Sequence, residues 1–178
     1  VCVDDNFTAV TLNTLSAVLK GCNNNVCLFL RNDGEAVAFQ CLKRPGTRIA
    51  AARLLADIVY TTPGRQLLLT DSGDPTQILE YVFHMLTSSR DRNVVAEMVM
   101  ILHYAAWGLG PVDKARMGMA IPTLLDSRKR WPESDDDLHA KFLGAIARGS
   151  KGSNHNVSLF LSNDGEAVAF QCLKRPGT

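Results

Sequence analysis

The sequence predicts an all-α fold, an α-solenoid built from three-helix repeats, and two observations lead to that prediction. The first is a duplication: residues 21–47 return as residues 152–178, 131 positions later and with four differences. The second is that apolar residues recur at helical spacing along most of the 178-residue chain, between short breaks rich in Gly, Pro, Asn and Asp. Because long fixed periods are typical of repeat architectures, the duplication indicates that 131 is a multiple of a shorter period.

The first predicted unit is one long helix followed by two short ones. The long helix covers residues 5 to about 20, with Asp4, Asp5 and Asn6 as acidic and capping groups at its start. The short helices cover 26–30 and 35–43; they are separated by Asn32-Asp33-Gly34 and ended by Pro45-Gly46.

The same order then returns along the chain. Thr47 is predicted to cap the second long helix, Asp91 opens the third, and Ser134 to Asp137 cap the fourth. After the opening unit, the predicted helices are a long one over 47–60, short ones near 66–69 and over 74–86 (opened by Asp74-Pro75), a long one over 91–104, short ones over 112–119 and 121–125, and a long one from 134 onward.

The break between the two short helices defines the shorter period. It falls at Gly34, Gly73, Ala120 and Gly165, with spacings of 39, 47 and 45 residues that together make the 131-residue offset. A period of about 40 to 47 residues is expected of armadillo and HEAT units. The sequence therefore predicts a single array with approximate units 1–21, 22–61, 62–108, 109–150 and 151–178.

Two stretches carry a family resemblance. Ile121-Pro122-Thr123-Leu124-Leu125 follows a small residue, and Ala51-Ala52-Arg53-Leu54-Leu55-Ala56-Asp57-Ile58-Val59 lies in a long helix; both resemble the alternating consensus helices of armadillo repeats. The chain resembles the armadillo-repeat family over nearly its whole length. This resemblance implies a right-handed superhelix whose third helices line a concave groove, and a non-enzymatic scaffold that binds a partner protein or peptide there.

The resemblance also indicates which residues face the groove. In importin-α-like and β-catenin-like members, a Trp and an Asn four residues apart on each third helix hold a peptide. The matching positions here contain neither residue type, so we expect a groove without an asparagine ladder. The matching pairs are Val10 and Thr14, Arg53 and Asp57, Val99 and His103, and Lys141 and Ala145. We take Thr14, Arg53, Asp57, His103 and Lys141 as candidate groove contacts, although Arg53 and Asp57 are spaced to pair with each other.

Composition argues against several other classes of protein. The formal net charge is +1 and the basic residues are scattered, so we expect no nucleic-acid partner. No apolar run approaches the roughly 20 residues that span a bilayer, so we expect no membrane segment. The four histidines, His84, His103, His139 and His155, are dispersed, so we expect no catalytic or metal site and no cofactor. Trp107 and Trp131 are expected to be packing residues.

Cysteine usage favours an intracellular protein, cytoplasmic or nuclear. The five cysteines are an odd number, and Cys22 and Cys27 are Ser in the duplicate, which a disulfide framework would not permit in both copies. Asn6 and Asn156 fit the glycosylation sequon, but both fall at predicted helix starts, where we expect them to act as caps. The chain does not begin with Met, so we expect it to be part of a longer protein.

The duplication also predicts an interaction. The helix over 48–60 should pack on 22–44, and 153–175 presents nearly the same surface, so we expect head-to-tail self-association through 153–175. Alternatively, a helix resembling 48–60 follows Thr178 and covers that surface within the chain. For the function, two alternatives to the scaffold stay open: an architectural spacer in a cytoskeletal or ciliary assembly and, less favoured, a HEAT-like chromophore lyase.

Overall fold

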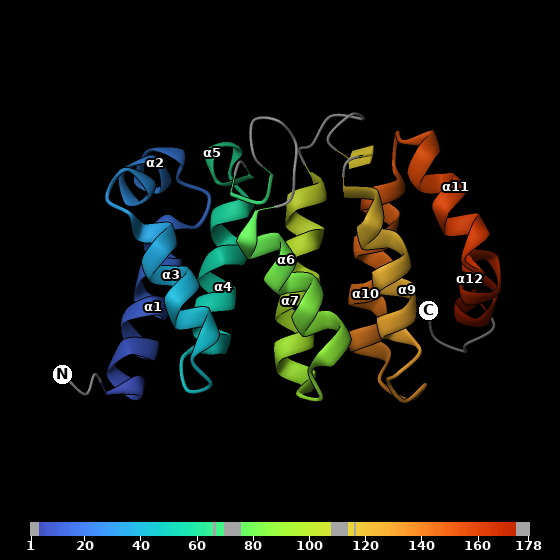
Figure 1. Ribbon diagram of the computed structural model, residues 1–178, viewed down its shortest axis with the longest axis horizontal. Coiled ribbons are helices and arrows are strands. Elements are labelled where there is room, and N and C mark those ends of the chain that lie inside the picture. Colours follow the sequence, from blue (N-terminus) through green and yellow to red (C-terminus); the bar gives the residue numbers. More distant parts are fainter. Residues whose placement is uncertain (1–3, 66, 70–75, 108–113, 116, 174–178) are drawn as a thin grey trace.

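The protein is all-helical in the part of the chain that the computed structural model describes, residues 4–65, 67–69, 76–107, 114–115 and 117–173, and no strand element occurs there (Figure 1). This confirms the predicted all-α class. The helices are α1 (Asp5–Leu19), α2 (Asn23–Arg31), α3 (Gly34–Lys43), α4 (Arg48–Val59), α5 (Thr62–Arg65), α6 (Gln77–Ser88), α7 (Arg92–Trp107), the 3-10 helix η1 (Met117–Met119), α9 (Ala120–Arg128), α10 (Asp136–Ser150), α11 (Asn154–Ser162) and α12 (Gly165–Leu173).

The long helices α1, α4, α7 and α10 lie side by side in chain order, and each packs on the next (Figure 1). A second row lies in front of them in this view: α3 packs on α4, α6 on α7, and α9 on α10. The C-terminal ends of the long helices all lie at the upper edge of Figure 1. Residues of successive long helices, which lie far apart in the sequence, therefore become neighbours in space.

Hydrogen bonds between successive long helices join residues that are 41 to 45 positions apart in the sequence. These separations are close to the predicted spacings of 39 to 47 residues. The separations are 41 residues for Ser16 and Asp57, 44 for Arg53 and Glu97, 43 for Arg92 and Asp135, and 45 for His103 and Arg148.

The hydrophobic core is one continuous cluster that extends from Leu12 in α1 to Val168 in α12. Burial is greatest in the middle of the row: α4 has eight buried residues among 12, whereas α1 has three among 15. The reason is that α4 packs on α1, α3 and α7, whereas the main contacts of α1 are with α4 and α2. Each fully buried leucine contributes about 2 kcal/mol of transfer free energy, so most of the packing energy lies in the central helices.

Acidic residues begin three of the long helices. Asp4 accepts a hydrogen bond from the N–H of Asn6 at 2.8 Å, and Asp91 accepts one from the N–H of Asn93 at 2.9 Å. Asp135 accepts from the N–H of Leu138 at 3.2 Å. Free N–H groups at a helix start need such acceptors, which confirms the acidic caps expected at these positions.

Two predicted caps are wrong, and a third is right in position alone. Thr47 is the N-cap residue of α4, but its hydroxyl donates to the carbonyl of Cys41 at 2.7 Å instead of accepting from α4. Asn6 is not the cap of α1, since Asp4 has that role. Ser153 caps α11, while Asn156 is buried with 1% of its surface exposed, so its sequon is inaccessible in the folded chain.

The breaks between short helices agree with the prediction where they can be compared. Gly34, Ala120 and Gly165 are the first residues of α3, α9 and α12. The second predicted break, Gly73, and the Asp74-Pro75 start lie outside the described residues, as do residues 112, 113 and 116 of the predicted segment 112–119. The short helix expected at 66–69 is wrong, because α5 spans Thr62–Arg65 and Leu67–Leu69 lie beyond it in non-helical backbone.

Candidate functional site

The predicted groove residues all lie on the long helices, and most of them contact a neighbouring long helix. Arg53 and Asp57 are on α4, His103 is on α7 and Lys141 is on α10. Thr14 is on α1, where its exposed hydroxyl donates to its own helix one turn earlier at 3.0 Å. We call the surface that these side chains share the long-helix face.

The contact between α1 and α4 centres on Asp57. Its Oδ2 accepts a short hydrogen bond from the hydroxyl of Ser16, and its Oδ1 lies 3.7 Å from Nζ of Lys20. Ser16 is 7% exposed, so this hydrogen bond is largely shielded from water. Asp57 therefore joins α4 to α1 and its C-cap residue, Lys20.

The contact between α4 and α7 uses Arg53. Its Nε donates to Oε1 of Glu97 at 2.8 Å. The expected pairing of Arg53 with Asp57 is therefore wrong. The two side chains point to opposite neighbours, Arg53 to α7 and Asp57 to α1, because each long helix is flanked by one on either side.

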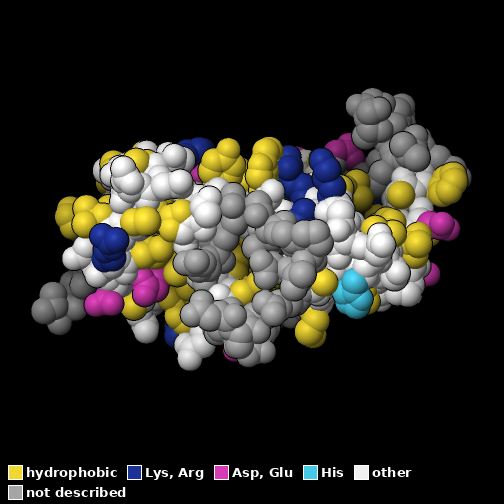
Figure 2. Space-filling model, turned by 90° about the horizontal axis from the view of Figure 1, so that it is seen from above, with side chains coloured by type: hydrophobic (Ala, Val, Ile, Leu, Met, Phe, Trp, Pro, Cys, Tyr) yellow, Lys and Arg dark blue, Asp and Glu magenta, His cyan; other side chains and the backbone are white. Residues whose placement is uncertain are grey.

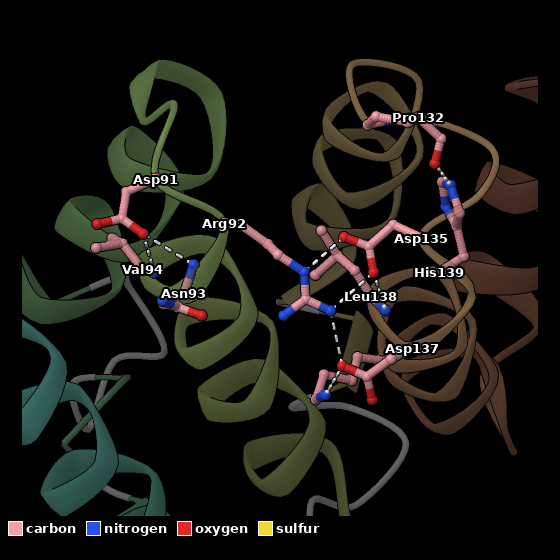
Figure 3. Close-up of polar contacts among 10 residues, drawn as sticks. Asp91, Arg92, Asn93, Val94, Pro132, Asp135, Asp137, Leu138 and His139 are labelled. Atoms are coloured by element: carbon pink, nitrogen blue, oxygen red, sulfur yellow. Dashed lines mark hydrogen bonds and ion pairs between the residues drawn. The ribbon is translucent and has the colours of Figure 1, made fainter.

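The contact between α7 and α10 is the most extensive ion-pair network of the long-helix face (Figure 3). Arg92 binds both carboxylate oxygens of Asp135, with its Nε 2.6 Å from Oδ2 and a terminal nitrogen 2.7 Å from Oδ1. The same guanidinium reaches Asp137 at 2.9 Å, and Lys141 also donates to Asp137. The planar guanidinium fits a carboxylate through two parallel hydrogen bonds, which makes this pair geometrically specific.

These contacts shift the acidities in the network. The hydrogen bond from Arg92 lowers the pKa of Asp135 to about 2. Hydrogen bonds from Lys141 and then Arg92 lower the pKa of Asp137. The carboxylates and their cations compensate one another, so Lys141 is committed to its own chain and is a weaker candidate for a ligand contact.

A cluster of aromatic and cationic side chains occupies the C-terminal ends of α4, α7 and α10. We call Tyr60, His103, Tyr104, Trp107 and Arg148 the aromatic–cationic cluster. The rings of Tyr60 and Tyr104 meet edge to face with centroids 5.3 Å apart, and Tyr60 lies 6.2 Å from Trp107. The guanidinium of Arg148 lies 3.5 Å above the centre of the Trp107 ring. Such stacked groups are attracted through the ring quadrupole.

The cluster is accessible from outside. Trp107 is 49% exposed and Tyr60 is 39% exposed. An exposed Trp held in one orientation by a stacked arginine can contact a partner with little loss of side-chain entropy. Arg53 is also exposed, with 55% of its side chain accessible, but its Nε is held by Glu97.

His103 is the predicted groove residue that belongs to the cluster. Nε of Arg148 donates to its Nε2 at 2.9 Å, so this ring nitrogen is an acceptor. Burial and then the charge of Arg148 lower the pKa of His103. His103 is therefore a neutral support for Arg148 at physiological pH.

Positive charge extends from the cluster to Lys114 and Lys151. Nζ of Lys114 donates to the carbonyl of Lys151 at 3.0 Å. Burial, followed by the charges of Lys151 and Arg148, lowers the pKa of Lys114. Within the described ranges, no carboxylate forms an ion pair with Lys114, Arg148 or Lys151. Figure 2 shows Lys and Arg side chains gathered beside hydrophobic ones along the upper edge of that view.

The described histidines at positions 103 and 139 take part in contacts within the chain. No group of three or more His, Cys, Asp or Glu side chains among them is arranged to hold a metal ion. His139 bonds the carbonyl of Pro132 at 2.9 Å, and His103 supports Arg148. None of the helices in the described part of the chain has the length and apolar character needed to cross a membrane.

Sequence patterns missed most of the aromatic–cationic cluster. The sequence predicts Trp107 as a packing residue only, and it does not distinguish Tyr60 or Arg148 from their neighbours. Their common signal is position: each lies in or next to the last turn of a long helix, and Tyr60 and Tyr104 are 44 residues apart. The unequal 47-residue spacing in the middle of the chain obscured this alignment.

Comparison of the chain with protein-family models, with curated proteins and with solved structures found no significant match. The function is therefore inferred from the packing and from the surface chemistry.

Proposed function

We propose that the chain is an armadillo-like, right-handed α-solenoid that acts as a non-enzymatic scaffold and holds an acidic segment of a partner protein on its long-helix face. The observation that carries the proposal is the aromatic–cationic cluster with its uncompensated neighbours Lys114 and Lys151.

Repeat-to-repeat packing supports the solenoid. The long helices contact one another in chain order, and hydrogen bonds between them join residues 41 to 45 positions apart. In a solenoid, each unit buries its apolar side against its neighbours, so such a period in the contacts is expected. The long helices correspond to the third helices of armadillo units, which line the groove.

Charge supports an acidic partner. Arg148 and Lys151 lie at the C-terminal end of α10, and Lys114 approaches them from an earlier part of the chain. Burial, and then the charges of Lys151 and Arg148, lower the pKa of Lys114. A carboxylate-bearing segment would relieve this repulsion, and aromatic side chains of that segment could stack beside Trp107. Arg53, Asp57 and Lys141 would then hold the repeats in register, with Arg148 and Trp107 contacting the ligand.

A peptide-binding experiment tests the proposal. The probe is a labelled synthetic peptide in which Glu alternates with Tyr, and the reference is the same peptide with Lys in place of Glu. Fluorescence anisotropy should show that the acidic peptide binds and the Lys peptide does not. The binding should weaken as salt is added, because salt screens exposed charges. Arg148→Glu should weaken binding by about tenfold or more, equivalent to about 1.4 kcal/mol.

A matched variant separates binding from folding. Lys129→Glu makes the same charge change at a 52% exposed side chain at the end of α9, where Lys129 pairs with Asp126. It should leave binding unchanged. Lys151→Glu, at an exposed position, provides a second variant in case Arg148→Glu unfolds. Equal binding of both peptides, or equal effects of all three variants, would rule out this site.

A further inference from the structure

The two copies of the duplicated sequence lie at opposite ends of the row of helices (Figure 1). The correspondence is wider than the sequence identity, since α1, α2 and α3 begin 131 residues before α10, α11 and α12 respectively. The same structural unit therefore stands at both ends of the molecule. We call α1–α3 the first unit and α10–α12 the last unit.

Equivalent residues of the two units have opposite exposure. Val37 in the first unit is 56% exposed, while its counterpart Val168 in the last unit is 5% exposed. The reverse holds one helix earlier, where Val26 is fully buried and its counterpart Val157 is 41% exposed. Each unit therefore has two apolar sides, and each end of the molecule leaves a different one uncovered.

The uncovered side of the first unit, which we call the N-end face, is strongly apolar. Figure 2 shows hydrophobic side chains gathered at its left end, where this unit lies. An open groove of about 400 Å³ runs between α1, α2 and α3 on this unit, lined among others by Val18, Leu28 and Val37. The exposed apolar residues of the N-end face are Phe7, Val10, Val18, Leu28 and Val37.

The uncovered side of the last unit, the C-end face, consists of Val157, Leu161 and Phe170, which are 41%, 50% and 64% exposed. Their counterparts in the first unit are covered by the rest of the chain. Val26 is fully buried, and Leu30 and Phe39 are half-buried against the core, with Phe39 edge to face against Tyr81 at 5.8 Å.

We propose that the N-end face of one molecule binds the C-end face of a second molecule, so that copies of this chain associate head to tail. Each face is the side of a repeat unit that this same chain already buries at its other end. The first unit of a second copy can follow α10–α12 in space as the next repeat follows α1–α3 within the chain. A second copy fits as the occupant because its free N-end face is the side of a unit that packs on a preceding unit, as Val168 does within this chain.

The contact is heterologous, because two different faces meet, and a pair of bound copies still presents one free face at each of its ends. Such an association does not close on itself and continues into linear assemblies. The driving force is burial of apolar surface.

Mixing two variants tests the proposal. Val37→Asp puts a charge on the N-end face and Phe170→Asp puts one on the C-end face; both positions are exposed, so folding should be retained. In sedimentation velocity, the unaltered chain should form larger species as concentration rises. Each variant alone should associate at least about tenfold more weakly. An equimolar mixture should form a 1:1 dimer, because the intact C-end face of Val37→Asp can bind the intact N-end face of Phe170→Asp. The dimer should grow no further, because both of its free faces carry an Asp.

Ala36→Asp and Ala167→Asp are the matched controls, because this position is exposed in both units and belongs to neither face. Both controls should associate like the unaltered chain. A chain that stays monomeric over the whole concentration series would overturn the proposal. So would a variant mixture that stays monomeric, or association lost in Val37→Asp and kept in Phe170→Asp, which would indicate a symmetric dimer instead.

Discussion

The first and last units show what an almost identical sequence does in two different surroundings. Their backbones agree in detail: Asp33 and Asp164 both take left-handed conformations, with φ of 55° and 60°, and each precedes the glycine that opens the next helix. In both, a phenylalanine of the preceding helix packs directly over that glycine. Local sequence is thus sufficient to specify the turn.

The surroundings, by contrast, decide which side of each unit is buried. Asn25 and Asn156 both donate a hydrogen bond to the carbonyl seven residues earlier, at 3.0 Å and 2.9 Å. Asn156 donates a second one to the carbonyl of Lys114 at 2.7 Å, because the last unit has a repeat before it. Equivalent residues should therefore contribute unequally to stability, and paired substitutions measure the difference.

The largest difference is expected at this asparagine. Asn156→Ala leaves the carbonyls of Lys114 and Gly149 without their donor in a buried site, which should lower the free energy of unfolding by about 2–3 kcal/mol. Asn25→Ala removes one hydrogen bond at a partly exposed site and should cost about 0.5–1 kcal/mol. Urea unfolding followed by circular dichroism compares the two. Equal losses would show that the preceding repeat adds nothing.

The next difference in stability is expected at two pairs of equivalent valines. The costlier substitution should lie in the first unit for one pair and in the last unit for the other. Val26→Ala should cost about 2 kcal/mol, because two buried methyl groups are lost and a cavity forms, whereas Val157→Ala should cost less than about 0.5 kcal/mol. The order reverses at the other pair: Val168→Ala should be costly and Val37→Ala nearly neutral. Midpoints of thermal unfolding for the four variants test this, and the same order at both pairs would contradict it.

A smaller effect, equal in both units, is expected at the glycines. A Cβ on Gly34 would lie 2.5 Å from ring atoms of Phe29, and Gly165 meets Phe160 in the same way. Displacing either ring should cost about 1–2 kcal/mol, offset in part by the better helix propensity of Ala. Gly34→Ala and Gly165→Ala should therefore lower the unfolding midpoint by similar amounts. Unequal shifts would show that the turn depends on its surroundings.

The smallest effect is expected at the helix starts, and it depends on pH. Asp135 caps α10 and binds Arg92, which lowers its pKa from 3.8 to about 2. A carboxyl whose pKa is depressed in the folded state stabilises the fold above its unfolded pKa, and this stability is lost as the pH falls from about 4 to about 2. Asp135→Asn should flatten the acid limb of the stability profile in that window.

Asp4 is the matched position in the first unit, where it caps α1 through Asn6 and has no arginine partner among the described residues. Asp4→Asn should leave the acid limb nearly unchanged, because Asn is also a good cap. An NMR titration in which Asp135 keeps an ordinary midpoint would contradict the ion pair with Arg92.

The fold was more predictable than the site, for a physical reason. Helix positions follow from apolar spacing and acidic caps, which are local, so Asp91 and Asp135 could be recognised as helix starts. The partner of a side chain on a repeat depends on the neighbouring repeat. Arg53 was therefore assigned to Asp57, four residues away, when its partner is Glu97, 44 residues away. The Arg148–Trp107 stack is equally non-local.

The sequence by itself determined the positions of the long helices and the turns that precede Gly34 and Gly165, because these depend on interactions within a few residues. Only the tertiary structure decided which side of each unit is buried and which charges are paired. Val37 and Val168 occupy the same local sequence, yet one faces water and the other is buried. The difference arises because burial is a property of neighbours that the local sequence does not encode.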